Sequence, residues 1–382
     1  MTLSVCLLTR NEEKNIARAL RSVRGVADQV IVADTGSSDR TVPIAIELGA
    51  EICHVAWQDD FAAGRDTALA RARSDWILWL NPDEELLATS ESEVRACLGR
   101  QEAFGYYVIV HELVEADQPH NYSETTQLRL FRRRPQLRSQ GRLHPSFVPP
   151  LEELAEHEGK RLYVTEIRLQ RHAYLSQLTE AKLRWAARLL ELELRDRPGQ
   201  LHYLIQYGRT LLLLNDPTAH VVLAEAVEQL LPLRSAPAAP LPEVQRLLEY
   251  ELTVSPEQSR SRLTREEACN LAQRWFPYSP AMLWRIGEYY FQRNDFRRAA
   301  EFLERLDECR RTGVYDRSES FDPAILGELV VLNLGVCYTR LSQLDKAERC
   351  FLSLLENPTF RDRAAQNLAL VQSMRGQSTN MN

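Results

Sequence analysis

The sequence predicts an α/β domain with a mainly parallel sheet, followed by an all-α domain of helical repeats. In the first half, short apolar runs alternate with segments whose apolar residues recur at helical spacing, a pattern typical of layered parallel sheets. From about residue 178 to residue 374, nearly every segment has helical periodicity instead. Because 382 residues are too many for one ordinary core, we expect two domains, over residues 1–174 and 175–382.

The first domain is expected to begin with alternating strands and helices. Short apolar runs predict strands at residues 3–8, 30–33, 51–55 and 76–80. Helical spacing predicts helices between them at residues 16–23, 42–48 and 61–72, the first two followed closely by a glycine that favours termination. Two later strands are predicted at residues 106–111 and 126–131, and a loop-rich stretch then reaches about residue 164.

Two stretches of the second domain are similar to each other. Residues 283–290 read Leu-Trp-Arg-Ile-Gly-Glu-Tyr-Tyr and precede Asp-Phe-Arg-Arg-Ala-Ala, and the same order recurs from residue 331 to residue 347. Glycine, tyrosine and alanine occupy matching offsets, which resembles the tetratricopeptide repeat, a helix pair with small residues where the helices cross. A looser third copy is expected at residues 203–214, and a Pro/Ala-rich linker at residues 235–242.

Composition and charge argue against several functional classes. A formal charge of −6 gives no overall attraction to nucleic acid or to an anionic membrane surface. The apolar run at residues 211–214 is far too short to span a bilayer, and the first ten residues lack the basic and apolar regions of a secretion signal. Seven scattered cysteines without CxxC spacing favour free thiols, so we expect a cytoplasmic protein.

Two polar clusters follow predicted strands and indicate where a binding site would form. Residues 34–41 read Asp-Thr-Gly-Ser-Ser-Asp-Arg-Thr, and residues 81–85 read Asn-Pro-Asp-Glu-Glu. In open α/β sheets, ligands bind just beyond the carboxyl ends of the strands. The first cluster offers hydroxyls, a glycine turn and a carboxylate, and the second offers three carboxylates. Together they predict a pocket for a nucleotide and a cation.

Four motifs in a fixed order resemble family 2 glycosyltransferases, in the branch that carries tetratricopeptide-like repeats behind the catalytic domain. They are Asn-Glu-Glu at residues 11–13, the cluster at 34–41, Asp-Asp-Phe-Ala-Ala-Gly-Arg-Asp at 59–66, and Trp-Ile-Leu-Trp-Leu-Asn-Pro-Asp-Glu at 76–84. The resemblance covers about residues 1–174. It implies a GT-A-type fold, a nucleotide-diphosphate sugar donor with UDP as the expected nucleotide, and a divalent cation, Mg or Mn.

The chain departs from the family at the metal motif. Where the family usually has Asp-x-Asp-Glu, this chain has Asn81, Pro82, Asp83 and Glu84. Divalent cations prefer charged oxygen ligands, so Asn81 is expected to weaken metal binding. The resemblance implies that Asp83 holds the cation and the donor diphosphate, with Glu84 and Asn81 near the donor. The alternative is that Asp83 and Glu84 simply begin a helix, with Asp83 as its N-cap.

The other expected donor contacts come from the first three strands and the helix after them. Asp34 and Thr35 stand where the family holds the nucleoside, although Asp34 could instead form an ordinary Asx turn that caps the following helix. Arg65 stands where the family has an arginine near the donor, and its guanidinium suits phosphate oxygens, although a surface ion pair with Asp59 or Asp60 is the alternative. Three residues after the first strand complete the predicted nucleotide contacts, Thr9, Asn11 and Glu12.

Two histidines match the family's later motifs. His144 follows Gly-Arg-Leu, and here Pro145 replaces the family's glutamate; we expect His144 to orient the acceptor or remove its proton. His172, with a tyrosine two residues later, stands where related folds complete metal coordination. A hydrogen-bonded structural role is the alternative for both.

The expected reaction is glycosyl transfer from a nucleotide sugar to an unidentified glycan, lipid-linked, peptide or protein acceptor, with inversion implied by the family. The rival interpretation is a nucleotide-binding scaffold with weakened catalysis, whose helical repeats bind a protein partner. Asn81 and Pro145 both favour that rival. The repeats could also mediate self-association.

Overall fold

The computed structural model describes residues 1–113, 122–172 and 179–379, and it divides the chain into two compact units. The first unit comprises Met1–Asp216 and the second Pro217–Asn382. The boundary that the sequence predicts, after residue 174, falls in the segment 173–178, outside the described residues.

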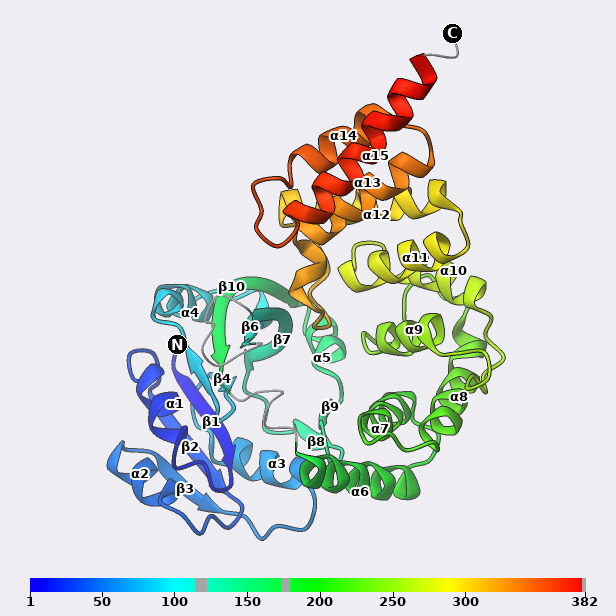
Figure 1. Ribbon diagram of the computed structural model, residues 1–382. Coiled ribbons are helices and arrows are strands. Elements are labelled where there is room, and N and C mark those ends of the chain that lie inside the picture. Colours follow the sequence, from blue (N-terminus) through cyan, green and yellow to red (C-terminus); the bar gives the residue numbers. More distant parts are fainter. Residues whose placement is uncertain (114–121, 173–178, 380–382) are drawn as a thin grey trace. The chain divides into compact units, whose positions relative to one another are not determined.

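The first unit is built on an eight-stranded sheet whose first half is parallel (Figure 1). Its strand order is β3-β2-β1-β4-β7-β6-β10-β5. The four predicted early strands are confirmed as β1 (Leu3–Thr9), β2 (Gln29–Asp34), β3 (Glu51–His54) and β4 (Trp76–Trp79), which pair in parallel. Because parallel strands end at one edge, the clusters after β1, β2 and β4 come together there.

The second half of the sheet mixes both strand directions. The two later strands are confirmed as β6 (Ala103–Leu113) and β7 (Tyr122–Arg132), both longer than predicted. Two strands were not predicted, β5 (Glu84–Leu86) and β10 (Arg161–Arg171). β10 runs parallel to β6 and antiparallel to β5. The stretch expected to be loop-rich also contains β8 (Arg138–Gln140), β9 (Ser146–Val148) and the helix α5 (Leu151–His157).

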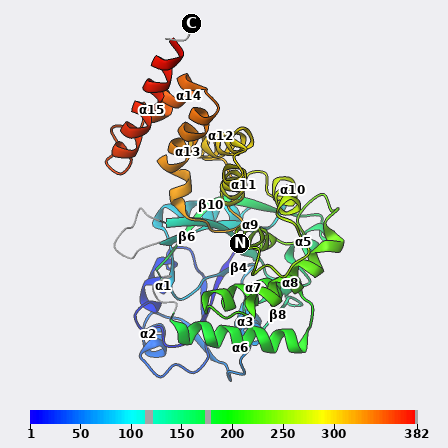
Figure 2. The ribbon, with the colours of Figure 1, turned by 45° about the vertical axis from the view of Figure 1, so that its right-hand side comes forward.

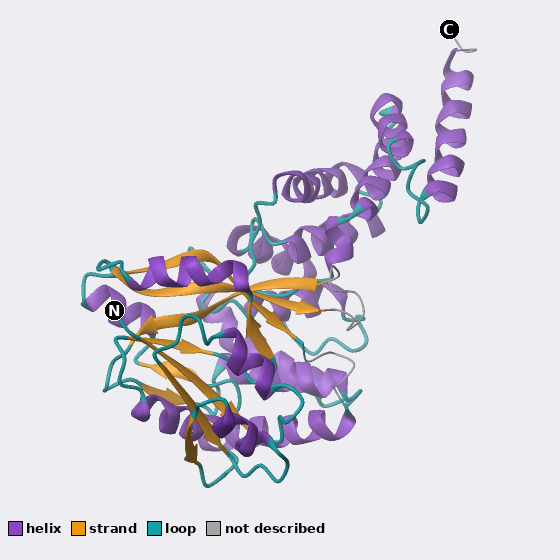
Figure 3. Ribbon diagram, turned by 90° about the vertical axis from the view of Figure 1, so that its left-hand side faces the viewer, coloured by secondary structure: helices purple, strands orange, loops and turns teal. Residues whose placement is uncertain are grey.

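Helices cover both faces of the sheet (Figure 3). Alternate strand residues pack against α1 (Ile16–Ser22), α2 (Thr41–Glu47) and α4 (Glu91–Leu98) on one face. On the other face, residues such as Cys6, Ile31 and Phe131 pack with α3 (Phe61–Arg71) and α5. This period-two alternation explains the continuous apolar runs of the early strands, because a sheet buried on both sides needs no polar face.

Two further helices, α6 (Glu180–Asp196) and α7 (Leu201–Leu213), belong to the first unit. α6 lies beside α3 in two views (Figure 1 and Figure 2). A small apolar cluster joins Leu189, Leu190 and Tyr203 of these helices to Leu143, and Phe61 of α3 packs against it. The looser third repeat expected at residues 203–214 falls on α7, within this first unit.

The second unit is helical throughout its described part. Its helices are α8 (Ala219–Leu230), η3 (Leu231–Leu233), α9 (Val244–Thr253), α10 (Arg265–Trp275), α11 (Pro280–Gln292), α12 (Phe296–Thr312), η4 (Pro323–Leu326), α13 (Glu328–Arg340), α14 (Leu344–Leu352) and α15 (Arg361–Thr379). The two predicted repeats are the helix pairs α11–α12 and α13–α14. A Cβ on Gly335 would lie 2.5 Å from the ring of Phe351, so this crossing needs a glycine. The predicted fold class, α/β followed by all-α, is confirmed.

The state of the cysteines and the length of the helices are the last features of the fold. All seven cysteines are free. In the described part of the chain, no helix is both long and apolar enough to cross a membrane.

Candidate functional site

A pocket of about 550 Å³ opens at the carboxyl ends of β1 and β4, where the sequence predicts a site. Its walls come from the turns after these strands, from α3 and α6, and from the loop before β9. The lining residues are Leu8, Thr9, Arg10, Glu12, Thr35, Trp57, Phe61, Arg65, Trp79, Asn81, Pro82, Asp83, Leu143, His144, Pro145, Arg171 and Trp185. Seven of the eleven predicted site residues are among them, namely Thr9, Glu12, Thr35, Arg65, Asn81, Asp83 and His144.

Asp34 is buried and holds the turn after β2. Its Oδ2 accepts hydrogen bonds of 3.0 Å from the backbone N–H groups of Gly36 and Ser37, and its Oδ1 accepts one of 2.5 Å from the Ser37 hydroxyl. Gly36, with φ at +99°, makes this tight turn possible. Asp34 therefore forms the Asx turn that was its alternative, although it does not cap the following helix α2, whose N-cap is Arg40. It places Thr35 at the pocket, where the Thr35 hydroxyl donates to the Thr9 carbonyl at 3.1 Å.

Asn11 and Glu12 follow β1 and have different surroundings. The Asn11 Oδ1 accepts from the Ser38 backbone N–H at 2.8 Å, so Asn11 ties two loops together and does not line the pocket. Glu12 does line it, and its carboxylate accepts from Asn15 at 2.8 Å. Burial raises the pKa of Glu12, and the nearby charge of Asp83 adds to this effect. A carboxyl group at the pocket is thereby biased towards its protonated form.

Glu84 is enclosed and fully bonded. Its carboxylate accepts from the Asn81 backbone N–H at 2.9 Å, from the Asn81 amide at 2.8 Å and from Arg129 Nη2 at 3.0 Å. Glu84 has no exposed surface and opens β5, so no helix begins in this segment and the helix N-cap alternative is wrong. Asn81 keeps its predicted place at the pocket, while Glu84 supports it from behind.

Asp83 reaches the pocket and forms an ion pair with Arg171 at the end of β10. Arg171 Nε donates to Asp83 Oδ2 at 3.0 Å, and Arg171 Nη1 lies 3.2 Å from Glu112 Oε1. Burial alone lowers the pKa of Arg171, but Asp83, Glu84 and Glu112 more than offset this and raise it. Arg171 therefore stays charged and neutralises Asp83. This pairing could not be foreseen from the sequence, because β10 was not predicted.

His172 contacts a different carboxylate. Its Nε2 lies 2.8 Å from Glu85 Oε1, and its backbone N–H donates to the Asp83 carbonyl at 2.9 Å. His172 does not line the pocket. The backbone of His172 thus lies beside Asp83, but its ring contacts Glu85, and the Asp83 side chain pairs with Arg171 instead.

The residues near Asp83 do not fit a divalent cation in this arrangement. Such ions need several oxygen ligands, most of them charged. Asp83 already receives Arg171, Glu84 is enclosed, and Asn81 is neutral. In residues 1–113, 122–172 and 179–379, no three His, Cys, Asp or Glu side chains are grouped so as to hold a metal ion. The sequence-based expectation of Mg or Mn at Asp83 and His172 thus has no preformed ligand set here.

Arg65 is a buried cation that faces the pocket. Its guanidinium lies between two rings, with its carbon 4.7 Å from the centre of Trp79 and 3.9 Å from that of Phe147. Nη1 donates to the Pro145 carbonyl at 3.0 Å, whereas the buried Nε has no hydrogen-bond partner among the described residues. Burial lowers the pKa of Arg65 to about 9, with a further contribution from Arg129. The surface ion pair that was its alternative is wrong.

His144 lies at the pocket in a loop that α6 and α7 hold in place. The neighbouring Arg142 backbone N–H donates to Glu193 at 2.8 Å, and the Arg142 side chain pairs with Asp196 at 2.7 Å. The Tyr203 hydroxyl donates to the Gln140 carbonyl at 3.3 Å. The position of His144 thus depends on helices beyond residue 174.

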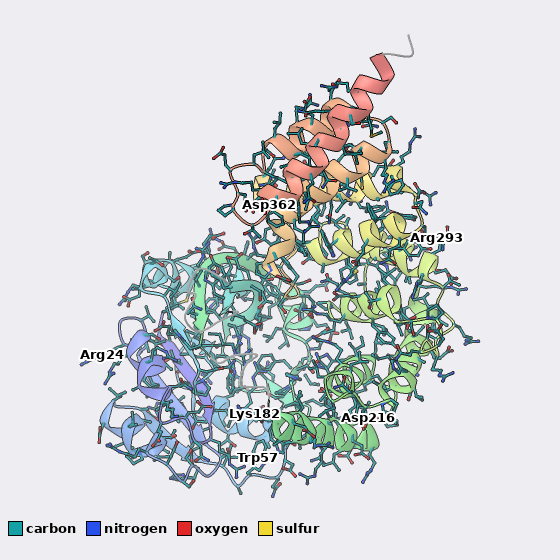
Figure 4. The ribbon with its side chains drawn as sticks, viewed as in Figure 1. Arg24, Trp57, Lys182, Asp216, Arg293 and Asp362 are labelled. Carbon is teal, nitrogen blue, oxygen red and sulfur yellow. The ribbon has the colours of Figure 1, made fainter. Side chains whose placement is uncertain are left out.

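An aromatic wall completes the pocket, and little in the sequence pointed to it. Trp57 and Trp185 stack with their ring centres 6.4 Å apart, and Phe61 meets both edge-on. In Figure 4 the reader can locate this wall from the labels of Trp57 and of Lys182, which lies on α6 three residues before Trp185. Trp57 lies close to the motif that contains Asp59 and Asp60, so the sequence offered a signal for it. Trp185 has the pattern of an ordinary apolar position in an amphipathic helix, which offers no such signal.

Comparison with known proteins bears on the same part of the chain. Residues 4–147 match the model of the family described as glycosyl transferase family 2. This segment is therefore similar to family 2 glycosyl transferases. This segment contains every lining residue of the pocket except Arg171 and Trp185.

Two kinds of relative match this part of the chain, one named for its TPR repeats and one named as a glycosyltransferase. A TPR repeat-containing protein of Synechococcus elongatus is 41% identical over 156 residues, which are 41% of this chain and 38% of that protein. The SPbeta prophage-derived glycosyltransferase SunS of Bacillus subtilis is 26% identical over 219 residues, 56% of this chain and 50% of SunS. This chain thus spans well under two thirds of their lengths.

Among solved structures, glucosyl-3-phosphoglycerate synthase from Mycobacterium tuberculosis, in complex with Mn²⁺, UDP and glucosyl-3-phosphoglycerate, is similar with 25% identity and a TM-score of 0.25. The match covers 28% of this chain and 44% of that one.

Proposed function

We propose that this protein transfers a sugar from a nucleotide-diphosphate donor, most simply a UDP-sugar, to a hydroxyl acceptor. The observation that carries the proposal is the pocket in the segment that matches family 2 glycosyl transferases, at the strand ends where α/β sheets bind ligands. Its walls combine three guanidinium groups, those of Arg10, Arg65 and Arg171, with hydroxyls and an aromatic surface. That combination suits a diphosphate beside a flat ring.

The roles of the individual residues follow from their surroundings. Thr9, Thr35 and Glu12 would contact the nucleoside, because they lie at the ends of β1 and β2. Arg65 would attract phosphate oxygens through its positive charge, and the charge that develops on the leaving diphosphate would strengthen this attraction. His144 would accept the acceptor's proton. Inversion at the sugar remains an expectation from the family.

A divalent cation is expected from the resemblance to the family. When bound, Mg or Mn would neutralise the departing diphosphate. Because the residues near Asp83 do not fit such an ion as they stand, we derive no step through it.

The experiment that tests the proposal measures donor binding and turnover separately. Melting of the full chain should shift upwards with UDP, UDP-glucose or UDP-N-acetylglucosamine, by several degrees when the ligand is about a hundredfold above its Kd. Slow release of UDP from a UDP-sugar without acceptor would then show an enzyme. The absence of any shift with these ligands and with GDP-mannose would contradict the proposal.

A second candidate is a nucleotide-binding scaffold whose repeats hold a protein partner. Asn81 favours it, because its amide is committed to Glu84 and carries no charge for a cation. A UDP-induced melting shift without any hydrolysis or transfer would favour the scaffold over the enzyme.

The acceptor and the location belong to the same proposal. Glycan, lipid-linked, peptide and protein acceptors all remain open, and the helical second unit would contribute to their choice or to self-association. A cytoplasmic location is in keeping with seven free thiols.

A further inference from the structure

Asp83 has a compensating positive charge beside it. The residue is 7% exposed, and a carboxylate so deeply placed needs such a charge. Arg171 Nε supplies it at 3.0 Å, from the end of a strand of the same sheet. The carboxylate and the guanidinium are therefore already a neutral pair before any ligand enters.

A divalent ion at the same place would meet positive charge. On the remaining oxygen of Asp83, the ion would lie close to Arg171, and Arg129 lies just behind, 3.0 Å from Glu84. Glu84 offers no free charge, since three donors surround its carboxylate. Three carboxylates, those of Asp83, Glu84 and Glu112, face the guanidinium groups of Arg171 and Arg129, so two positive charges already offset most of the negative charge that would attract a divalent ion.

Arg171 also has the freedom to bind a ligand. It lines the pocket, and its side chain is 36% exposed. Nε is bonded to Asp83 and Nη1 to Glu112, whereas Nη2 makes no hydrogen bond with a residue of the described ranges. Two carboxylates hold the planar group in place, so its remaining N–H donors are fixed in direction and suit a phosphate oxygen.

We propose that Arg171 takes the place of the divalent cation in this pocket, so that the diphosphate of the donor binds without metal. The inference rests on the proposed function, because it assumes a nucleotide-diphosphate donor. Asp83 then serves to fix Arg171 and does not coordinate an ion. Together with the charge of Arg65, the unused N–H donors of Arg171 would stabilise the diphosphate as it leaves.

Wild-type protein and one variant test the proposal through UDP affinity, measured by calorimetry in EDTA and again with Mn²⁺. Wild type should bind UDP equally well in both conditions. Arg171→Met should weaken UDP binding in EDTA by at least about 30-fold, because a buried charged partner is lost. Mn²⁺ should restore part of that loss, since Asp83 no longer has its arginine.

Two further variants make the result specific. Arg168→Met is the matched control on the same strand, since Arg168 pairs with the exposed Glu166 at 2.6 Å and does not line the pocket, and it should bind UDP like wild type. Arg171→Lys keeps the positive charge but loses the planar guanidinium with its several N–H donors. It should therefore retain an intermediate affinity for UDP without metal. If Arg171→Met does not fold, the UDP affinity of Arg171→Lys and that of wild type in EDTA and in Mn²⁺ still test the proposal.

The possible outcomes distinguish this role of Arg171 from the glycosyltransferase activity itself. UDP binding by wild type only in Mn²⁺, or unchanged UDP affinity of Arg171→Met in EDTA, would overturn the metal-independent role while leaving a glycosyltransferase. No binding of UDP or GDP in either condition would remove both proposals.

Discussion

Gly141 shows how closely single residues control the pocket loop. Its φ is +120°, and a Cβ there would lie 1.9 Å from the Tyr203 hydroxyl. Gly159 also has a positive φ, at +63°, but a Cβ added to it would have no described atom within 4 Å. A substitution at Gly159 therefore meets backbone strain alone, whereas one at Gly141 meets strain and collision.

Gly141→Ala is expected to destabilise the first unit more than Gly159→Ala. Positive φ costs an alanine about 1–2 kcal/mol at Gly159, whereas at Gly141 the φ of +120° lies outside the left-handed helical region and the clash with Tyr203 is added. Adding Tyr203→Phe should recover part of the loss, since it removes the clashing oxygen. Urea unfolding of the four proteins measures this. Equal losses at both glycines would contradict the clash.

Arg65→Met is expected to separate binding from stability. The charge is buried and its Nε has no partner among the described residues, so the substitution should leave the melting temperature unchanged or raise it. Affinity for UDP should fall at least about tenfold, because a charged contact to phosphate is lost. Calorimetry measures the UDP affinity and thermal melting measures the stability. A parallel loss of affinity and stability would make Arg65 a structural residue.

The sequence identified residue types at this scale better than their partners. It placed Asp83, Arg65 and His144 at the pocket through motif order. It could not show that Asp34 would fold back onto Gly36 and Ser37, or that Arg171 would reach Asp83, because these contacts depend on strand register and turn geometry.

At the scale of elements, the parallel strands were predictable and the later ones were less so. β1 to β4 are short apolar runs buried on both faces, which sequence patterns reveal well. β10 mixes apolar, polar and charged residues without a regular period, as in Arg-Leu-Tyr-Val-Thr-Glu-Ile-Arg, and this irregular pattern weakens the strand signal. The short β5 is defined only by its pairing with β10.

A prediction at this scale concerns the join between β7 and α5. Hydrogen bonds from Arg134, and to a lesser degree from Lys160, lower the pKa of Glu158 to about 2. The folded carboxyl prefers its charged form, so its stabilisation is present above pH 4.5 and is lost as pH falls towards 2. At neutral pH, Glu158→Gln should cost about 1–3 kcal/mol, allowing for partial exposure.

Unfolding of wild type and Glu158→Gln between about pH 7 and pH 2.5 checks this expectation. The difference in unfolding free energy should shrink steadily below pH 4.5, the ordinary pKa of the group. A difference that stays constant with pH would mean that shape and not charge accounts for the effect.

For the whole molecule, the first unit extends past the segment that matches the family. α6 and α7 lie beyond that segment, and α6 contributes Trp185 to the pocket and Glu193 to the loop of His144. Glu193 is completely buried, so its two arginine contacts, Arg142 and Arg197, belong to the core of this unit. The domain boundary expected after residue 174 remains a prediction that a shortened chain can test.

A chain ending at Asp216 is expected to melt cooperatively and to bind UDP with nearly the affinity of the full protein. A chain ending at residue 174 would expose Leu143 and Phe61 and leave Arg142 without Glu193, so it should melt at least about 10 °C lower. Thermal melting and calorimetry of both chains check this. Equal behaviour would assign α6 and α7 to the helical repeats.

The dependence of the His144 loop on α6 has a consequence for protein engineering. Chimeras that exchange helical arrays between relatives would naturally be spliced just behind the catalytic motifs. In this protein such a splice would import a foreign helix into the wall of the pocket, replacing Trp185 and the acidic side chains that hold Arg142. Donor recognition would then change together with the array, whereas a splice behind Asp216 should transplant the array alone.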